Sequence, residues 1–362
     1  MSCLESGWIT TGPRVAQFTE NLKTYLQAPY VLPLTSATAG LHLALLALDL
    51  KPGDEVITTP LTFAATLNTI VLAGGKPVLI DIDPTTLNMD INQLESVITD
   101  HTRAIIPVHF AGLPVDLDPL YEMAANHGLR VLEDAAHAIG AAYKGKRIGS
   151  FGDTQIFSFH PNKNMTTGEG GCVSTMDPKL AEKIGLLRFH GIDREAWNRF
   201  SKSGSQHYEI VMPGYKYNMM DLQAALGIHQ LKELDQFIAR RTELAERYQE
   251  ALSDWPQWMI PGVPHYEHKH AWHLYTPLLN EEAAGMTRDE FMLAMKGKNI
   301  GTGLHYRAAH LFPYYRQQFG FEPGDFPCAE EAAERIVSLP LFPSMSDADH
   351  DRVLDVMYGV FN

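Results

Sequence analysis

The segment DTQIFSFHPNKNMTTGEGGCVST, residues Asp153–Thr175, decides the fold of this 362-residue chain. Its two ends, DTQIFSFH and GGCVST, are apolar and predict two buried strands. No helix fits between them, so the second strand can reverse the direction of the first. The connection carries Lys163 between Pro161 and a run of glycines. Such a lysine is either an ordinary loop residue or an amine whose pKa is lowered for Schiff-base chemistry.

Upstream of this segment, strand-like runs alternate with stretches of helical spacing. The helical stretches are Thr62–Ala73, Asp90–Ile98 and Leu117–Asn126. The alternation predicts crossover units, a mostly parallel sheet and therefore an α/β fold. The strand-like runs are EVITTP (Glu55–Pro60), PVLIDID (Pro77–Asp83), RAIIPVH (Arg103–His109) and LRVLEDAAH (Leu129–His137).

Downstream of the segment the pattern changes. The polar stretch Ala196–Pro213 predicts a surface loop, and Asp221–Leu252 predicts a long helix that bridges two domains. The later strand-like runs HLYTPLL (His273–Leu279) and GTGLHYR (Gly301–Arg307) are interspersed with helical stretches. This mixture predicts a small α+β domain after the large one. The expected domains are residues 1–235 and 236–362.

The composition excludes several classes of protein. The chain has 29 Lys and Arg against 43 Asp and Glu, a net charge of −14. This balance argues against a nucleic-acid partner, since neutralising phosphates needs a basic face. No apolar run reaches the length of a membrane span and the N-terminus has no export signal, so we expect a cytoplasmic protein without membrane association. Three scattered cysteines predict neither a disulfide framework nor a zinc site.

Two residues near the end of LRVLEDAAH are candidates for chemistry. Asp134 ends the apolar part of this strand, and ligands of open α/β sheets bind at the carboxyl ends of strands. A carboxylate there is partly desolvated and needs a cationic or protonated partner. Asp134 can equally be a strand-end aspartate satisfied by its neighbours, and the same two interpretations hold for His137.

The stretch TSATAG, Thr35–Gly40, opens the helical run LHLALLAL. Small residues at a helix start let backbone N–H groups approach an anion, although Ser and Thr there usually serve as caps. Phe63, after the strand EVITTP, is either a core residue or a stacking platform. A phosphate cradle, an aromatic face, a strand-end aspartate and a later lysine, in this order, are together what pyridoxal phosphate requires.

Several longer motifs support this interpretation, and they run from SGWITTGP (Ser6–Pro13) to SLPLFP (Ser338–Pro343). They are EDAAHAIGA, FSFHPNKNMTTGEGG, RFHGI, PGYKYNMMDLQAA and NIGTGLHYRAAH. With them the chain resembles the DegT-type (DegT/DnrJ/StrS) sugar aminotransferases, pyridoxal-phosphate enzymes of fold type I, like aspartate aminotransferase. SFHPNKN, PGYKYNM and IGTGLHYRAAH are most similar to the branch that forms UDP-4-amino-4-deoxy-L-arabinose. Members usually carry a further strand or helix before SGWITTGP, so a shortened N-terminus is expected.

The resemblance implies a role for each candidate residue. Lys163 would bond to the cofactor's aldehyde and then move the proton between the donor's Cα and the cofactor's C4′. Asp134 would pair with the ring nitrogen. His305 would contact the substrate, and Asn218 would reach the cofactor phosphate of the neighbouring subunit, so a homodimer with shared active sites is expected. The remaining cofactor contacts would be Ala37, Thr38 and Ser158 at the phosphate, and Phe63 and His137 at the ring.

The reaction implied by the resemblance moves an amino group from L-glutamate to a keto carbon of a nucleotide-linked sugar, leaving 2-oxoglutarate. A C4 ketone on a UDP-linked pentose is expected, in a lipopolysaccharide pathway that modifies lipid A. The alternatives are a 3-keto sugar of an antigen or antibiotic pathway, a PLP-dependent sugar dehydratase, and a regulator that binds the cofactor without turnover. In the dehydratase branch a histidine replaces the lysine, or cysteines hold an iron–sulfur cluster. The chain lacks the G-x-G-x-x-G motif of a dinucleotide dehydrogenase.

The sixteen histidines show no metal-ligand spacing, so no metal is expected. His265, His268, His270 and His273 cluster in sequence, and we interpret this cluster as a polar loop.

Overall fold

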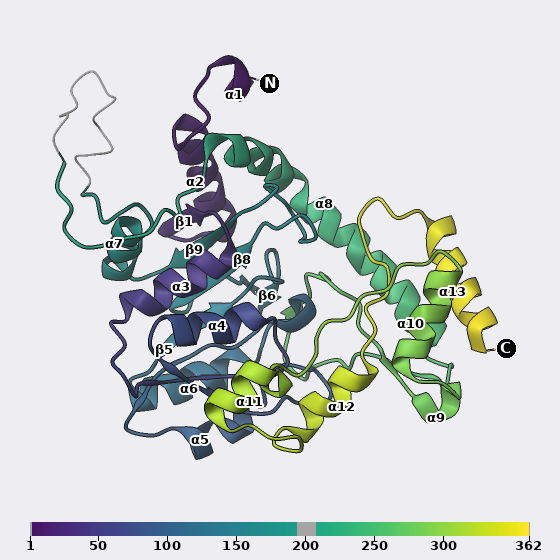
Figure 1. Cartoon of the computed structure of the whole chain (residues 1–362). Coiled ribbons are helices and arrows are strands. Elements are labelled where there is room, and N and C mark those ends of the chain that lie inside the picture. The colour runs from purple at the N-terminus through teal and green to yellow at the C-terminus, as the bar shows by residue number, and fades with distance from the viewer. Residues whose placement is uncertain (1, 194–207, 362) are drawn as a thin grey trace.

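The computed structural model describes residues 2–193 and 208–361 of the chain (Figure 1). Residues 196–207 of the expected surface loop Ala196–Pro213 therefore lie outside the described residues. Among the helices that are described, none combines the length and the apolar character that crossing a membrane requires.

A seven-stranded sheet with strand order β1-β9-β8-β5-β4-β2-β3 forms the centre of the fold. Neighbouring strands from β8 to β3 are parallel, whereas β9 is antiparallel to both β1 and β8. The expected mostly parallel sheet and the reversal between the two ends of Asp153–Thr175 are thus confirmed. The strands are β1 (Tyr30–Leu34), β2 (Glu55–Thr58), β3 (Lys76–Leu79), β4 (Thr102–Ile105), β5 (Arg130–Asp134), β8 (Thr154–Ser158) and β9 (Gly171–Thr175).

Helices cover both faces of this sheet (Figure 1). Alternate residues of one strand face opposite layers: Val131 of β5 belongs to the apolar cluster with α2, α6 and α8, whereas Leu132 belongs to the cluster with α3, α4 and α7. Because both faces are buried, the strands read as continuous apolar runs. The covering helices are α2 (Pro13–Leu26), α3 (Ala37–Ala47), α4 (Ala64–Leu72), α6 (Leu117–His127), α7 (Pro178–Leu187) and α8 (Asp221–Leu252).

The helix α8 connects two apolar cores. Its residues from Ala224 to Ile238 pack against the sheet layer, and those from Leu244 to Leu252 pack in a separate core with α10 and α13. Figure 1 shows α8 running from the sheet to this second core. The elements of the C-terminal part are α9 (Glu281–Ala284), α10 (Arg288–Gly297), α11 (Pro313–Phe319), α12 (Pro327–Arg335), α13 (Asp347–Phe361), β10 (Trp258–Met259) and β12 (Leu278–Leu279).

The strands expected in the C-terminal part are shorter than their patterns predict. Of His273–Leu279 only β12 is a strand, because Pro277 lacks the N–H group that a longer ladder needs. Gly301–Arg307 makes a single bridge, between Gly303 and Ser338.

A strand pair and a helix cap are among the contacts that bring the C-terminal part back to the sheet layer. The strand β11 (His268–Lys269) pairs with β6 (Ala142–Tyr143), which also pairs with β7 (Lys146–Arg147). The carboxylate of Asp81 accepts the backbone N–H groups of Cys328 and Ala329, both at 2.8 Å, at the start of α12. The remaining short helical elements are α1 (Ser2–Glu5), η1 (Ile91–Gln93), α5 (Leu94–Val97), η2 (Phe110–Gly112) and η4 (Ala309–Leu311).

Candidate active site

The carboxyl ends of the parallel strands open into one cavity of about 290 Å³. Segments that follow β1, β2, β5 and β8 line it, as does Gly170, the residue before β9. Ligand sites in open α/β sheets lie at this edge. Eight of the nine candidate residues predicted from the sequence meet here: Ala37, Thr38, Phe63, Asp134, His137, Ser158, Lys163 and His305.

Asp134 is the last residue of β5, and it is buried with its carboxylate at the cavity. Thr66 on α4 donates its hydroxyl to Oδ2 at 2.8 Å, and the backbone N–H of Ala136 donates to Oδ1 at 3.2 Å. Burial raises the pKa of Asp134, and these two hydrogen bonds oppose the rise. A protonated partner such as a pyridinium nitrogen would compensate the desolvated negative charge.

Lys163 follows β8 and its side chain lines the same cavity. Burial lowers the pKa of its amine from 10.5 to about 8, while the charge of Asp134 acts in the opposite direction. The Nζ atom lies 3.4 Å from Nε2 of His273. A lysine with this pKa has a substantial neutral fraction near neutral pH, which is the form that attacks an aldehyde.

The start of α3 forms one wall of the cavity. The Ser36 hydroxyl caps this helix by accepting the N–H of Ala39 at 3.0 Å, and the first N–H groups of a helix have no partner within it. Those of Ala37 and Thr38 are therefore available to an anion, which the helix dipole also favours. A Cβ on Gly171 would come within 2.5 Å of the Ala37 nitrogen, so β9 packs directly on this cradle.

Aromatic groups also line the cavity. The hydroxyl of Tyr306 lies 3.0 Å from His137 Nε2, and the two rings stack at an interplanar angle of 23°. Burial lowers the pKa of His137 well below 6.5, so its imidazole is neutral at pH 7. The ring of Phe63 is 61% exposed although Tyr306 lies near it, so a flat ligand can stack on it.

Sequence reasoning missed three residues at this site. Thr66 lies one turn into the helix that follows Phe63, and Tyr306 directly follows His305. Their proximity to candidates was the only available signal, because a threonine or a tyrosine alone indicates no chemistry. His273 was interpreted as part of a polar loop, but it is buried beside Lys163.

Asn218, the ninth candidate, lies outside this cavity. It borders a second, larger cavity together with Thr11 and Lys216. Its amide Nδ2 donates to Thr11 Oγ1 at 2.6 Å, and Lys216 donates to its Oδ1. The chain does not bring Asn218 to its own Lys163 cavity.

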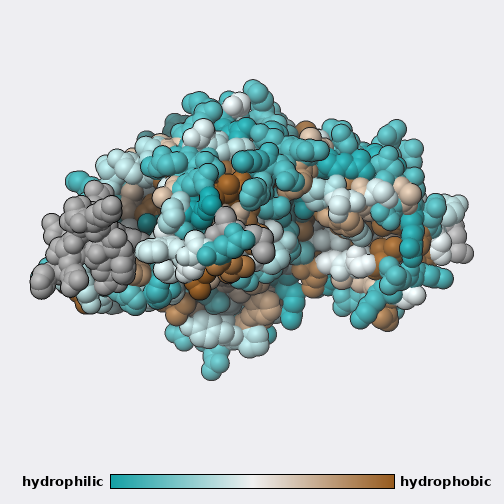
Figure 2. Space-filling view, turned by 90° about the horizontal axis from the view of Figure 1, so that it is seen from above, coloured by the Kyte–Doolittle hydropathy of each residue, from teal (hydrophilic) through white to brown (hydrophobic). Residues whose placement is uncertain are grey.

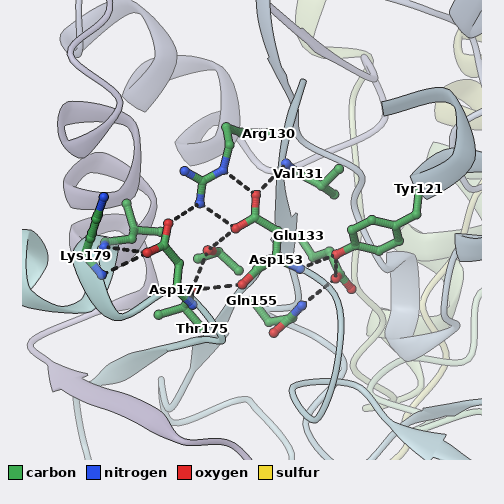
Figure 3. Close-up of polar contacts among 11 residues, drawn as sticks. Tyr121, Arg130, Val131, Glu133, Asp153, Gln155, Thr175, Asp177 and Lys179 are labelled. Carbon is green, nitrogen blue, oxygen red and sulfur yellow. Dashed lines mark hydrogen bonds and ion pairs between the residues drawn. The ribbon is translucent and has the colours of Figure 1, made fainter. Parts of the chain in front are cut away.

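A buried polar network supports β5 from the opposite side (Figure 3). Glu133 accepts hydrogen bonds from the Tyr121 hydroxyl and the Gln155 amide, both at 2.6 Å. His109 Nδ1 accepts the N–H of Val115 at 3.0 Å, so its Nε2 carries the hydrogen and donates to Glu133 at 2.7 Å. The network fixes the strand at the residue next to Asp134.

The network continues to the amino end of the strands. Arg130 makes a two-pronged pair with Asp153, with both N···O distances at 2.6 Å, and its second contact, to Asp177, is 3.3 Å long (Figure 3). The N–H of Asp153 donates to the Tyr121 oxygen at 2.9 Å, which joins this pair to Glu133. Asp177 also caps α7. These contacts fix β5, β8 and β9 relative to one another.

The donor set of the cavity fits pyridoxal phosphate. The same cavity offers free helix N–H groups to a phosphate, a buried carboxylate to a ring nitrogen, and a lysine with a lowered pKa to an aldehyde. The Nδ1 atom of His137 is buried and has no partner among the described residues, so it is available to a polar group of a bound ligand. Fold and site together define a fold-type-I enzyme that depends on pyridoxal phosphate.

Comparison with known proteins agrees with this class. The model of the DegT/DnrJ/EryC1/StrS aminotransferase family matches residues 1–358. The chain is 50% identical over 358 residues to the spore coat polysaccharide biosynthesis protein SpsC of Bacillus subtilis, an alignment that covers 99% of this chain and 92% of that protein. The chain therefore belongs to the DegT/DnrJ/EryC1/StrS family and is a sugar aminotransferase that uses pyridoxal phosphate.

Solved structures give the same result. DesV of S. venezuelae, solved with a ketimine intermediate, is 33% identical with a TM-score of 0.91 and is matched over 100% of this chain and 92% of its own. Helicobacter pylori PseC, an aminotransferase of pseudoaminic acid biosynthesis, is 29% identical with a TM-score of 0.91, over 99% and 94% of the two chains. These relatives confirm the expected fold and transaminase activity, and they argue against the dehydratase and regulator alternatives.

Proposed function

We propose that the enzyme transfers the amino group of L-glutamate to the C4 ketone of a UDP-linked 4-keto-pentose, in a pathway that modifies lipid A of lipopolysaccharide. Amino-group transfer is supported above all by Lys163, whose amine has a lowered pKa and lines one cavity with Asp134 and the start of α3. The C4 position and the pentose rest on the motifs SFHPNKN, PGYKYNM and IGTGLHYRAAH. A cytoplasmic location agrees with three free cysteines, which are the rule in reducing compartments.

The residues of the chain divide the work of the reaction. When bound, pyridoxal phosphate supplies an aldehyde that carries the amino group and a ring that takes up negative charge. The start of α3 and Ser158 would hold the phosphate, and Asp134 would keep the ring nitrogen protonated. Phe63 and His137 would lie against the ring. Lys163 would remove a proton from the donor's Cα and return it at the carbon that carried the aldehyde, and it would make this transfer in reverse for the sugar.

A long substrate has room next to Lys163. A third cavity, of about 910 Å³, shares Asn162, Lys163 and His305 with the cofactor cavity and continues along α8 to Phe342. His305 is held by a hydrogen bond of 2.8 Å between its Nδ1 and the Ser338 hydroxyl, which leaves its Nε2 for a sugar hydroxyl. This space supports a nucleotide-linked sugar over a free one.

The position of amination is tested with matched keto sugars. The enzyme is incubated with [¹⁵N]-L-glutamate and either a UDP-linked 4-keto-pentose or a nucleotide-linked 3-keto-hexose, and the labelled carbon is located by NMR. We expect label at C4 of the pentose, with 2-oxoglutarate formed in equal amount. Label at C3 of the hexose alone would replace the proposal with its main alternative.

We also propose a homodimer in which Asn218 completes the partner's site. Apolar side chains near the N-terminus and the start of α8 are exposed, among them Ile9, Ile210, Val211 and Leu222. Figure 2, seen from the side of α1, shows hydrophobic residues gathered between hydrophilic ones on this face. Exposed apolar patches of this kind mark protein interfaces.

Subunit complementation tests the shared site. Lys163→Ala and Asn218→Asp are each expected to be nearly inactive, because the first removes the amine and the second places a negative charge against phosphate. Mixed dimers contain one site with both native residues, so mixing the unfolded variants and refolding them together restores a substantial part of the activity. No recovery in verified mixed dimers would contradict the shared site.

A further inference from the structure

His273 is brought to the active site from a segment far away in sequence. Its side chain is buried, and Nε2 lies 3.4 Å from the Lys163 amine. Its ring centre is 4.4 Å from that of His137. Lys163 thus contacts the His273 imidazole, in addition to the electrostatic effect of Asp134.

The backbone around His273 is anchored on three sides. Its N–H donates to the Ala111 carbonyl at 2.9 Å, and the neighbouring Ala271 N–H donates to Gly112 at 2.9 Å. Its own carbonyl accepts Nη1 of Arg241 on α8 at 3.1 Å. Gly112 has φ +97, and a Cβ there would come within 2.8 Å of the His137 carbonyl and 3.2 Å of the His273 nitrogen. This close packing leaves little freedom for the imidazole to move away from Lys163.

The surroundings fix the charge of His273. Burial lowers its pKa well below 6.5, and the facing groups His137, Lys163, Arg241 and His305 lower it further. The imidazole is therefore neutral at pH 7. A neutral imidazole that accepts a hydrogen bond at Nε2 carries its hydrogen on Nδ1. This Nδ1 is buried and has no partner among the described residues, so packing and not a second hydrogen bond orients the ring.

We infer that His273 is a positioning residue for Lys163: its Nε2 accepts a hydrogen bond from the amine whenever the amine is not bonded to the cofactor. Transamination releases this amine in the first half-reaction and bonds it to the cofactor again only at the end of the second, and an unrestrained four-carbon stem would sample many rotamers in between. The hydrogen bond keeps Nζ at the reacting carbon, so the proton transfer needs no search. The inference rests on the family's aminotransferase activity and not on the identity of the sugar.

The first test uses the cofactor-free protein and the reactivity of a single lysine. Competitive labelling with acetic anhydride from pH 6 to pH 10, read out by mass spectrometry of the Lys163 peptide, gives the pKa of this amine. Wild type is expected to titrate near 8. Because the hydrogen bond favours the ammonium form, His273→Phe lowers the midpoint by roughly one pH unit. His273→Gln keeps an acceptor and stays closer to wild type, and His268→Phe, from the same histidine cluster but without a contact to Lys163, is unchanged.

Two results would overturn the inference. A midpoint in His273→Phe equal to that of wild type would show that no such hydrogen bond exists. Equal shifts in the Phe and Gln variants would show that packing alone matters. Since the cofactor-free protein is labelled, both results are independent of whether the proposed sugar is the substrate.

A second test does not depend on the folding of a variant at position 273. ¹⁵N NMR of histidine-labelled wild type should show one imidazole in the Nδ1–H tautomer whose Nε2 resonance moves in Lys163→Ala. An Nε2–H tautomer at His273 would contradict the inference. In the loaded enzyme, His273→Phe is expected to lower kcat more than tenfold with little change in the KM for the sugar, and His273→Gln should recover part of the loss.

Discussion

Replacing Glu133 by glutamine should destabilise the protein although the two side chains have nearly the same shape. Glu133 is 1% exposed and accepts three hydrogen bonds, from His109, Tyr121 and Gln155. In the glutamine variant the remaining oxygen can still face His109. The amide then faces the Tyr121 hydroxyl, which already accepts the N–H of Asp153 at 2.9 Å. The Tyr121 hydrogen is left without an acceptor.

The size of the effect follows from these contacts. One charge-assisted bond becomes neutral and at least one buried donor loses its acceptor, which together cost about 3 kcal/mol. For a chain of 362 residues this corresponds to a decrease in melting temperature of about 4 °C. Glu133→Leu leaves the His109 and Tyr121 donors without an acceptor, and Gln155 keeps only its bond to the Phe151 carbonyl, so this variant is expected to be worse than Glu133→Gln by at least about 1 kcal/mol.

The assay is thermal unfolding of the cofactor-free protein at one fixed concentration and scan rate, because a ligand or dimer shifts the apparent midpoint. Glu331→Gln is the matched control: Glu331 is exposed on α12 and pairs with Arg335 at 2.6 Å. A surface pair of this kind contributes at most about 1 kcal/mol, so the control should move the midpoint by about 1 °C or less. A midpoint for Glu133→Gln within the range of this control would refute the reasoning.

Four further predictions concern the cofactor site. Asp134→Asn and Asp134→Ala should keep the fold but lose most turnover, since neither can hold a protonated ring nitrogen, and wild-type rates in Asp134→Asn would contradict this. With a Lys163 pKa of about 8, against the usual 10.5, cofactor uptake by the cofactor-free protein should rise with pH and level off above about 8; a rise that continues towards pH 10 would be inconsistent with it. Between pH 8 and pH 10.5 the unfolded chain keeps the Lys163 proton that the folded protein has lost. This lysine therefore makes the free energy of unfolding rise with pH in that range, which denaturation at several pH values can check. Gly171→Ala should weaken cofactor binding more than tenfold in a fluorescence titration, because its Cβ would lie 2.5 Å from the Ala37 nitrogen, whereas Gly185→Ala meets only Leu32 at 3.7 Å and should bind normally.

The sequence predicted the sheet layer better than the C-terminal part. Apolar strands separated by helical stretches left few alternatives to a parallel sheet, and the absence of a helix between β8 and β9 predicted their reversal. Near Pro277 the backbone is extended but forms little ladder, and a pattern of apolar residues does not distinguish these two cases. Pairing of β11 with β6 is a contact between distant segments that local periodicity does not contain.

The residues of the candidate site could also be predicted only where they lie next to a recognisable strand or helix. Asp134 and Lys163 could be predicted because each ends or follows a strand, and the topology places such positions at one edge of the sheet. His273 lies where the expected polar loop meets the strand-like run His273–Leu279, and only its anchoring by Ala111 and Arg241 places it against Lys163. A sequence pattern carries no information on such anchoring.

The most direct test of the central claim is the absorbance spectrum of the purified protein with pyridoxal phosphate, before and after addition of L-glutamate, beside Lys163→Ala. We expect the band of the lysine-bound cofactor in wild type, its conversion by glutamate to the band of the pyridoxamine form, and its recovery when a keto-sugar nucleotide is added. The lysine-bound band should be absent in Lys163→Ala. A wild-type protein that forms no such band, or whose band does not respond to glutamate, would contradict the account.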